Sequence, residues 1–180
     1  MTESSVAGKY FEHLFAYALA VCKECKQGVL PSQVKSHLQR AHRVSRKQAE
    51  SIAEDIASWA GLVEYASELE VPSQVIPAIQ QLPVYVDGLM CQIDADYCRQ
   101  IFRSAHTIRD HWRKAHDWSV AGKGGRPSRD TQKKIHDRIS KSCKTVCCQR
   151  LLVHGQGSQY FQVHQPNEDG LSQGGNWSQG

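Results

Sequence analysis

Apolar positions recur at a helical period in three stretches of the chain. The stretches cover residues 33–42, 45–59 and 131–143, and each places its apolar side chains on one face. The second stretch opens with Ser45, followed three positions later by Gln48, which is the pattern of a capping box. We therefore expect three amphipathic helices, each packed by one face against another element.

Shorter apolar runs favour extended structure. Residues 18–21 and 84–86 are expected to be extended, and residues 146–153 and 158–163 have the pattern of two strands around a glycine-containing turn. The last two strands predict a C-terminal β-hairpin. Together with the helices, these runs predict a small α+β fold.

Four potential metal ligands lie around the first of these helices. They are Cys22, Cys25, His37 and His42, with two, eleven and four residues between successive members. Zn²⁺ takes four nitrogen and sulfur ligands tetrahedrally, with thiolates at about 2.3 Å and imidazoles at about 2.0 Å. A tight cysteine knuckle followed by two histidines from the end of a helix meets that requirement. We therefore predict a structural zinc site in a C2H2-type finger. The alternative is two reduced structural cysteines with surface histidines.

A second group of potential ligands lies between residues 91 and 116. His111 and His116 repeat the histidine spacing of the first site, and twelve residues separate Cys98 from His111. Six residues separate Cys91 from Cys98, where about two to four are usual, and Asp94 stands where a tight knuckle would place its second cysteine. We predict zinc bound by Cys91, Cys98, His111 and His116. Two alternatives stay open: Asp94 supplies a carboxylate ligand while Cys98 packs in the core, or this finger has lost its metal.

Basic residues are concentrated in the middle of the chain. Residues 99–150 carry 14 Lys and Arg against 4 Asp and Glu, whereas residues 1–98 carry 8 against 12 and residues 151–180 carry 0 against 2. Such a block favours a polyanionic partner, usually nucleic acid, although a solvated basic helix and linker would have the same composition. The predicted phosphate contacts are Arg99, Arg103, Arg109, Arg113, Lys114, Lys123, Arg126 and Arg129.

The base-reading positions of the two predicted fingers carry side chains poorly suited to sequence-specific recognition. These positions fall on Leu30, Gln33 and Ser36 in the first finger and on Ser104, Thr107 and Asp110 in the second. None is an arginine that could read guanine, and the carboxylate of Asp110 would repel the phosphate backbone of DNA. In addition, 48 residues separate His42 from Cys91, so the fingers cannot simply follow successive base triplets. We therefore predict phosphate contacts with little base specificity.

The main alternative is a protein-interaction module or regulator, in which structural zinc fixes a surface and no nucleic acid binds. It predicts an exposed apolar patch near Trp112 or Trp118. We do not expect an enzyme, because a catalytic zinc keeps an open coordination position and the first site is closed by four protein ligands. We expect neither a small-molecule substrate nor a membrane partner.

Three features bear on the compartment. The longest apolar stretch, residues 10–22, contains Glu12 and His13 and is too short to span a membrane. Residues 1–9 lack the charged-then-apolar order of a secretory signal. Seven cysteines, an odd number, suit metal binding in a reducing compartment better than a disulfide framework. We therefore expect an intracellular protein, located in the nucleus.

Several motifs follow one another in a distinctive order along residues 12–164. After the first finger come Leu82-Pro-Val-Tyr, Asp87-Gly-Leu-Met-Cys91, Cys98-Arg-x-Ile-Phe-Arg-Ser, His111-Trp-Arg-x2-His116-Asp-Trp118 and Gly125-Arg-Pro-Ser. This order resembles a fungal C2H2-type zinc-finger domain family of uncharacterised function, the orsellinic acid biosynthesis cluster protein D-like family. The resemblance implies a Cys-x2-Cys knuckle in the second finger, from which this sequence departs at Asp94. It implies no established activity.

These observations predict a zinc-stabilised α+β protein with two separated C2H2-type ββα fingers, extra helices and a C-terminal β-hairpin. Zn²⁺ is the cofactor expected in both fingers. The predicted segments are a disordered N-terminus (1–9), the first finger with its packing helix (10–60), a linker (61–88), the second, degenerate finger (89–118), a basic Gly/Pro linker (119–130), a helix and β-hairpin (131–164) and a disordered tail (165–180).

Overall fold

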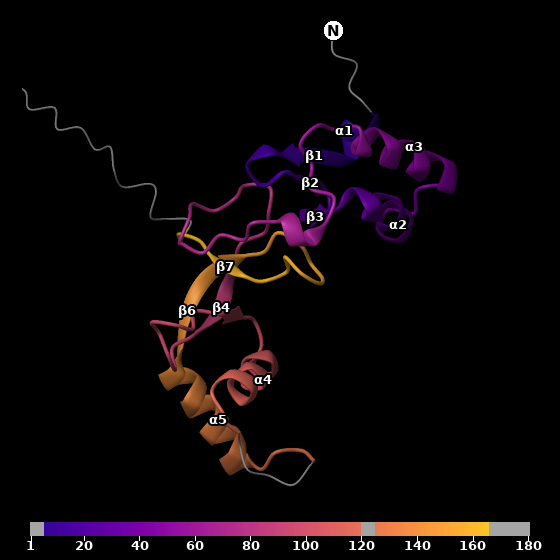
Figure 1. Cartoon of the computed structure of the whole chain (residues 1–180). Helices are drawn as coiled ribbons and strands as arrows, with labels where there is room; N and C mark the ends of the chain where they lie inside the picture. Colours follow the sequence, from indigo (N-terminus) through magenta and orange to yellow (C-terminus); the bar gives the residue numbers. More distant parts are fainter. Residues whose placement is uncertain (1–5, 120–124, 166–180) are drawn as a thin grey trace, which may run out of the picture. The chain divides into compact units, whose positions relative to one another are not determined.

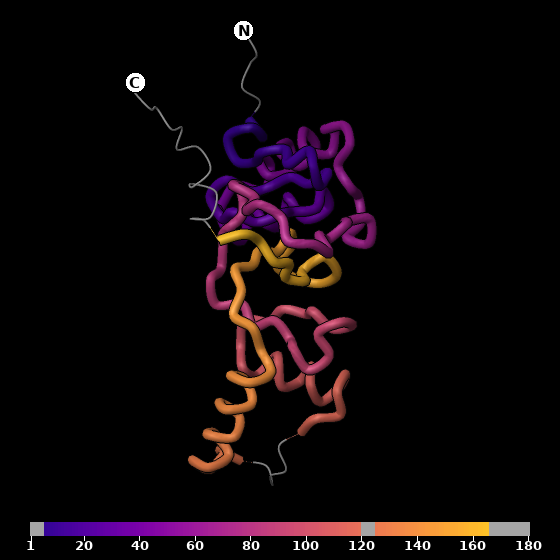
Figure 2. Tube along the Cα trace, turned by 90° about the vertical axis from the view of Figure 1, so that its left-hand side faces the viewer, coloured from indigo at the N-terminus to yellow at the C-terminus, as the bar shows by residue number. Residues whose placement is uncertain are grey.

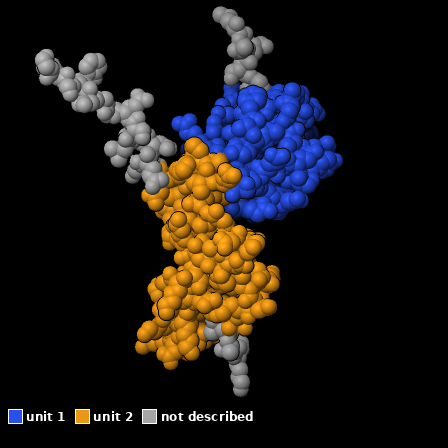
Figure 3. Space-filling model, turned by 60° about the vertical axis from the view of Figure 1, so that its left-hand side comes forward, with its two compact units in different colours: residues 1–73, 79–83, 149–160 blue, residues 74–78, 84–148, 161–180 orange. Residues whose placement is uncertain are grey.

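The computed structural model describes residues 6–119 and 125–165, which fold into two units (Figure 3). Unit 1 comprises Met1–Ser73, Ile79–Pro83 and Gln149–Tyr160, and unit 2 comprises the rest of the chain. Each unit therefore contains segments far apart in sequence. Within the described ranges, no helix is both long and apolar enough to cross a membrane.

Unit 1 begins with a short helix and a three-stranded sheet (Figure 1). Helix α1 (Val6–Tyr10) leads into β1 (Phe11–Leu14), and β2 (Leu19–Cys22) and β3 (Gln27–Val29) follow, all three strands antiparallel in the order β1-β2-β3. Residues 6–9, expected to be disordered, belong to α1 instead. The physical reason is burial, because Ala7 has no exposed surface and packs in the core of unit 1.

Two helices complete the first half of unit 1. Helix α2 (Pro31–Ala41) starts with proline at its first position and buries Val34 and Leu38. The cap position falls on Leu30, one residue before the proline, and its side chain makes no capping hydrogen bond. Helix α3 (Arg46–Ala57) has one of the two bonds of the predicted capping box: the hydroxyl of Ser45 accepts a hydrogen bond from the backbone N–H of Gln48 at 3.4 Å. The two helices and the sheet share one apolar core.

Unit 2 contains a four-stranded sheet and two helices. The strands are β4 (Tyr85–Cys91), β5 (Ile101–Phe102), β6 (Cys143–Gln149) and β7 (Phe161–Gln162), in the order β5-β4-β6-β7. Helix α4 (Ala105–Ala115) and helix α5 (Arg129–Ser142) are both capped by a serine, Ser104 and Ser128. A second core forms around Cys91, Ile108 and Trp112.

The C-terminal strands do not form the simple hairpin that the sequence predicted. Strand β6 ends at Gln149, and residues 150–160 then fold against unit 1 before the two-residue strand β7 pairs beside β6. Figure 2 shows this returning segment in yellow. The contact that holds it is nonlocal: the backbone N–H of Gly28 donates to the carbonyl of Leu151 at 3.0 Å. A local strand pattern cannot reveal such a contact.

Residues 61–88 are more ordered than a linker. They include a 3₁₀ turn (Ala66–Glu68) and the start of β4, and they contribute Ile79–Pro83 to unit 1. The buried side-chain amide of Gln149 holds this piece, because it donates to the carbonyls of Ile79 and Leu82, each at 2.8 Å. The disorder predicted for residues 1–5 and 166–180 lies outside the described residues.

Candidate metal centres

The first centre gathers the four side chains that the spacing predicted. Cys22 ends β2, Cys25 lies in the turn before β3, His37 lies in α2, and His42 follows that helix directly. One ligand atom from each residue lies within 4.8 Å of all the others. Strand, turn and helix thus converge on one point, as a tetrahedral site requires.

The distances between these atoms match the edges of a tetrahedron around zinc. The two imidazole Nε2 atoms of His37 and His42 are 3.3 Å apart, and His42 Nε2 lies 3.3 Å from Cys22 Sγ and 3.4 Å from Cys25 Sγ. The bond lengths of tetrahedral zinc give edges of about 3.3 Å between two nitrogens and about 3.5 Å between nitrogen and sulfur. These three distances, all from His42, therefore suit tetrahedral zinc.

Local backbone geometry explains why the cysteines converge. The N–H of Lys26 donates to the carbonyl of Cys22 at 2.8 Å, and Lys26 has a left-handed φ of 51°. This closes a tight turn in which the N–H of Cys25 points at Cys22 Sγ, 3.5 Å away. The turn therefore brings the two sulfurs together, as a site with two cysteine ligands requires.

The outer ring nitrogens of both histidines also have partners. Nδ1 of His42 lies 3.1 Å from the carboxylate of Glu24, and Nδ1 of His37 lies 3.4 Å from the side-chain amide of Gln27. A carboxylate on the outer nitrogen fixes the tautomer that leaves Nε2 free for a metal and makes that nitrogen a better ligand. The atom of the Gln27 amide that faces Nδ1 of His37 is its nitrogen, Nε2. Sequence reasoning missed both partners, although Glu24 lies inside the knuckle itself.

Proton equilibria at this centre favour neutral donors in the absence of a cation. Burial, followed by the neighbouring Cys22, raises the pKa of the Cys25 thiol to about 11. Burial, followed by the neighbouring His42, lowers the pKa of His37. Thiolates so close together need a compensating positive charge, and a divalent metal ion supplies it while displacing the thiol protons.

The second centre lies in unit 2, and its donors again come from the end of a strand, a loop and a helix. Cys91 ends β4, Cys98 lies in the loop before β5, and His111 and His116 lie in α4 and immediately after it. Their ligand atoms also lie within 4.8 Å of one another. The Sγ of Cys91 is 3.5 Å from His116 Nε2, and the Sγ of Cys98 is 3.2 Å from His111 Nε2.

Asp94 has a structural role in the second centre and is not one of its four converging donors. Its backbone carbonyl accepts hydrogen bonds from the N–H groups of Tyr97 at 3.1 Å and Cys98 at 2.6 Å. These bonds form a turn within the long loop, and the turn brings the sulfur of Cys98 to the centre. The four converging donors are therefore those of the wide-loop alternative, with Cys98 and without the carboxylate of Asp94.

Both histidine pairs end their helices in the same way. His42 and His116 donate their backbone N–H groups to the carbonyls of Leu38 and Trp112, at 3.1 and 2.9 Å. A residue with left-handed φ follows each histidine, Arg43 at 52° and Asp117 at 50°. This shared ending turns the chain away from the helix while keeping the second imidazole directed at the centre.

The predicted phosphate-binding residues are not equally available. Arg103 is paired with Asp87 through two bonds of 2.7 and 3.0 Å, and its guanidinium lies 3.7 Å above the ring of Tyr85. Arg113 lies 3.1 Å from Asp110 in an exposed ion pair. These two arginines already have intramolecular carboxylate partners, which sequence alone did not indicate.

The other predicted basic residues differ in exposure. The side chain of Arg109 is partly buried, and Lys123 lies outside the described residues. The exposed members of the set without a carboxylate partner among the described residues are Arg99, Lys114, Arg126 and Arg129. The structure therefore leaves a smaller exposed basic set than the sequence predicted.

Comparisons with known proteins agree with the order of motifs. The sequence profile of the family described as Orsellinic acid/F9775 biosynthesis cluster protein D matches residues 9–117. A protein of that name from Emericella nidulans is 29% identical over 108 residues, which cover 60% of this chain and 20% of that protein. The chain thus spans about a fifth of the length of this relative. No solved structure matches.

Proposed function

The chain belongs to the orsellinic acid/F9775 biosynthesis cluster protein D family, and we propose that this member binds two Zn²⁺ ions in C2H2-type ββα fingers. The observation that carries the proposal is the convergence of two Cys2His2 sets, each within 4.8 Å. Thiolate and imidazole ligands in a tetrahedral arrangement suit zinc better than the hard cations, which prefer oxygen.

Both ions have a structural rather than a catalytic role in this proposal. Each centre offers four protein donors, whereas a catalytic zinc keeps one position for water or substrate. In unit 1 the ion would join β2, the knuckle and α2, and in unit 2 it would join β4, the loop at Cys98 and α4. We therefore expect metal binding to stabilise folding, without an associated hydrolytic activity.

Unit 2 is proposed to bind nucleic acid in the nucleus, mainly through phosphate groups. Exposed basic residues support this, particularly Arg126 and Arg129, which precede or begin α5, and Lys133 and Lys134 within that helix. Contacts of this kind have little base specificity and weaken steeply as salt displaces the protein from the phosphates. Asp110 remains at a base-reading position and is paired with Arg113, which agrees with the absence of base reading.

The test is the salt dependence of binding to duplex and single-stranded DNA and RNA. Two lost phosphate contacts should reduce the slope of log K against log salt by about 2. We expect this change for the double variant that combines Arg126→Gln with Arg129→Gln. The control is the double variant that combines Arg43→Gln with Lys47→Gln in unit 1, for which we expect no change in the slope. Absence of salt-dependent binding by the zinc-loaded wild-type protein would refute the nucleic-acid proposal and leave the zinc proposal intact.

One observation favours a protein partner as the second candidate. Phe15 is 80% exposed, and its ring stacks on that of His13 with the ring centroids 3.9 Å apart. The centroid of the His13 ring lies 5.8 Å from that of Trp59. Of the two tryptophans near which an apolar patch was expected, Trp112 is fully buried, and its ring lies 5.1 Å from that of the partly buried Trp118. A partner recovered on the zinc-loaded chain after nuclease treatment, and lost with Phe15→Ser, would support this candidate.

A further inference from the structure

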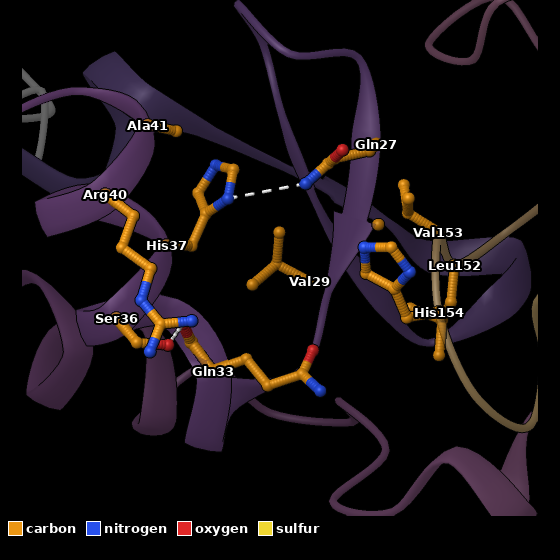
Figure 4. Close-up of a pocket in the computed structure, with 11 residues that line it drawn as sticks. Gln27, Val29, Gln33, Ser36, His37, Arg40, Ala41, Leu152, Val153 and His154 are labelled. Carbon is orange, nitrogen blue, oxygen red and sulfur yellow. Dashed lines mark hydrogen bonds between the residues drawn. The ribbon is translucent and has the colours of Figure 1, made fainter.

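A cavity of about 310 Å³ lies beside the first metal centre, entirely within unit 1 (Figure 4). Val29, at the end of strand β3, lies between the two sides of the cavity. Helix α2 forms one side, and residues 152–154 form the other. Small-molecule sites commonly have volumes of about 300–1,000 Å³, so this cavity has room for a small ligand.

The helical side of the cavity is one continuous face of α2. Gln33, Ser36, His37 and Arg40 all line it, and their spacing of three, one and three residues places them on the same side of the helix. In a DNA-reading finger this side would include base-reading positions. Here Gln33 and Ser36 share a cavity with the returning segment, so this face suits a small ligand better than a groove of DNA.

The opposite side of the cavity is anchored by close packing. The carbonyl of Leu151 accepts the 3.0 Å hydrogen bond from Gly28, and a Cβ placed on that glycine would lie 2.3 Å from the same oxygen. The N–H of Leu152 donates to the carbonyl of Gly157 at 3.2 Å, which closes the segment into a loop. The cavity therefore has two walls fixed by the fold of one unit.

The chemistry of the lining favours an anion with an apolar body. No aspartate or glutamate lines the cavity, and within the described chain the side chains of Arg40 and His154 have no hydrogen-bond or ion-pair partner. Ala41 and Val153 provide accessible apolar surface next to these polar groups, whereas Val29 and Leu152 are almost fully buried behind it. A single guanidinium matches one carboxylate in charge and can bind it through two parallel hydrogen bonds.

We propose that this cavity binds a carboxylate carrying an apolar substituent. Arg40 pairs with the carboxylate, while Ala41 and Val153 contact the substituent. A small organic acid and the C-terminus of a peptide ending in an apolar residue share this chemistry. The proposal does not depend on nucleic-acid binding, which we assign to unit 2, so either can fail without the other.

The experiment is an NMR titration of the zinc-loaded full chain with two carboxylate probes. The small acid is 4-methylpentanoate, the peptide is acetyl-Ala-Ala-Leu with a free C-terminus, and each has its neutral amide as the matched control. We expect saturable shifts at the backbone amides of Gly28, Ser36, Arg40 and His154, with binding at least about tenfold weaker for the amides because the charge-assisted bonds are lost. The carboxylate that binds more tightly shows whether the cavity prefers a small organic acid or the C-terminus of a peptide.

Two variants test the assignment of the carboxylate partner. Arg40→Gln should weaken binding of the better probe about tenfold, and Lys47→Gln, which removes an exposed charge from α3 outside the cavity, should leave it unchanged. If Arg40→Gln alters the spectrum away from the cavity, His154→Ala serves as the second variant. Absence of saturable shifts with both carboxylates, equal binding of the neutral amides, or unchanged binding by the cavity variants would overturn the proposal.

Discussion

The two metal centres use the same four ligand types but hold them by different means. In the first, the cysteines are joined by a two-residue knuckle, and Glu24 and Gln27 contact the outer nitrogens of the histidines. In the second, six residues separate the cysteines, and for the part of the chain that is described neither His111 nor His116 has a hydrogen-bond partner at Nδ1. The first centre thus has polar support that the second lacks.

Packing takes the place of that support in unit 2. His111 is only 8% exposed and its ring lies 4.9 Å from that of Phe102, while Trp112 beside it is completely buried. Lengthening a flexible loop from two to six residues costs about 1 kcal/mol of closure entropy, which is small compared with the burial of a large aromatic side chain. The comparison teaches that a wide knuckle is tolerated where the fold, rather than hydrogen bonds, orients the histidines.

The largest expected effect follows from removing a ligand of the first centre. Cys25→Ala should unfold the N-terminal part of unit 1, because structural zinc contributes about 10 kcal/mol or more to folding. Native mass spectrometry should show one zinc fewer per chain, and the NMR signals of α2 should lose their dispersion. Cys143→Ala is the control, since Cys143 is outside both donor sets and should keep both ions. A well-folded Cys25→Ala chain with undiminished zinc would contradict the account of this centre.

The second centre is tested by replacing each of its two alternative ligands, Cys98 and Asp94, with alanine in turn. Cys98→Ala should remove one zinc and destabilise unit 2, whereas Asp94→Ala should keep both ions because its backbone, not its side chain, forms the turn. Zinc content and thermal unfolding of the paired variants give the answer. Loss of zinc from Asp94→Ala with retention in Cys98→Ala would restore the carboxylate alternative.

A smaller effect should appear at the outer nitrogen of His42. Glu24→Gln keeps the size of the side chain but removes the carboxylate, and it should weaken zinc binding at the first centre about tenfold. Competition with a chelator measures the change, with Glu54→Gln, an exposed glutamate of α3, as the matched control. Equal zinc affinity in the two variants would mean that Glu24 does not tune the metal.

The smallest effect concerns pH and the pair between Asp87 and Arg103. The hydrogen bond from Arg103 lowers the pKa of Asp87 in the folded protein. Its ionised form is therefore favoured by folding, so the contribution to stability is present above the ordinary aspartate pKa and is lost as pH falls through the lowered value. Unfolding midpoints of wild type and Asp87→Asn should converge on acidification. A constant difference would show that the pair has no pH-linked role.

Local patterns predicted the parts of this fold that depend on local chemistry. The ligand spacings identified both donor sets, and the cap at Ser45 and the apolar faces of α2 and α3 are confirmed. The spacing could not show that the turn at Asp94 brings Cys98 inward, because that depends on backbone hydrogen bonds in a long loop. The return of residues 150–160 to unit 1 was also hidden, because Gly28 and Leu151 meet only in the folded chain.

The cavity beside the first centre was hidden for the same reason. Its helical wall contains residues interpreted from sequence as poor base readers, and its other wall, residues 152–154, was predicted to be part of a hairpin. Neither segment indicates a pocket alone. Their juxtaposition shows that Gln33 and Ser36, interpreted from the sequence as poor base readers, line a cavity.

The central claim is that each Cys2His2 set holds one zinc ion, and metal content measures it most directly. Native mass spectrometry of the intact chain, with elemental analysis of the same sample, should give two Zn²⁺ per chain, and a strong chelator should remove both with loss of folded structure. A zinc-free chain that retains its fold would contradict the claim for both centres, and a single ion would contradict it for one.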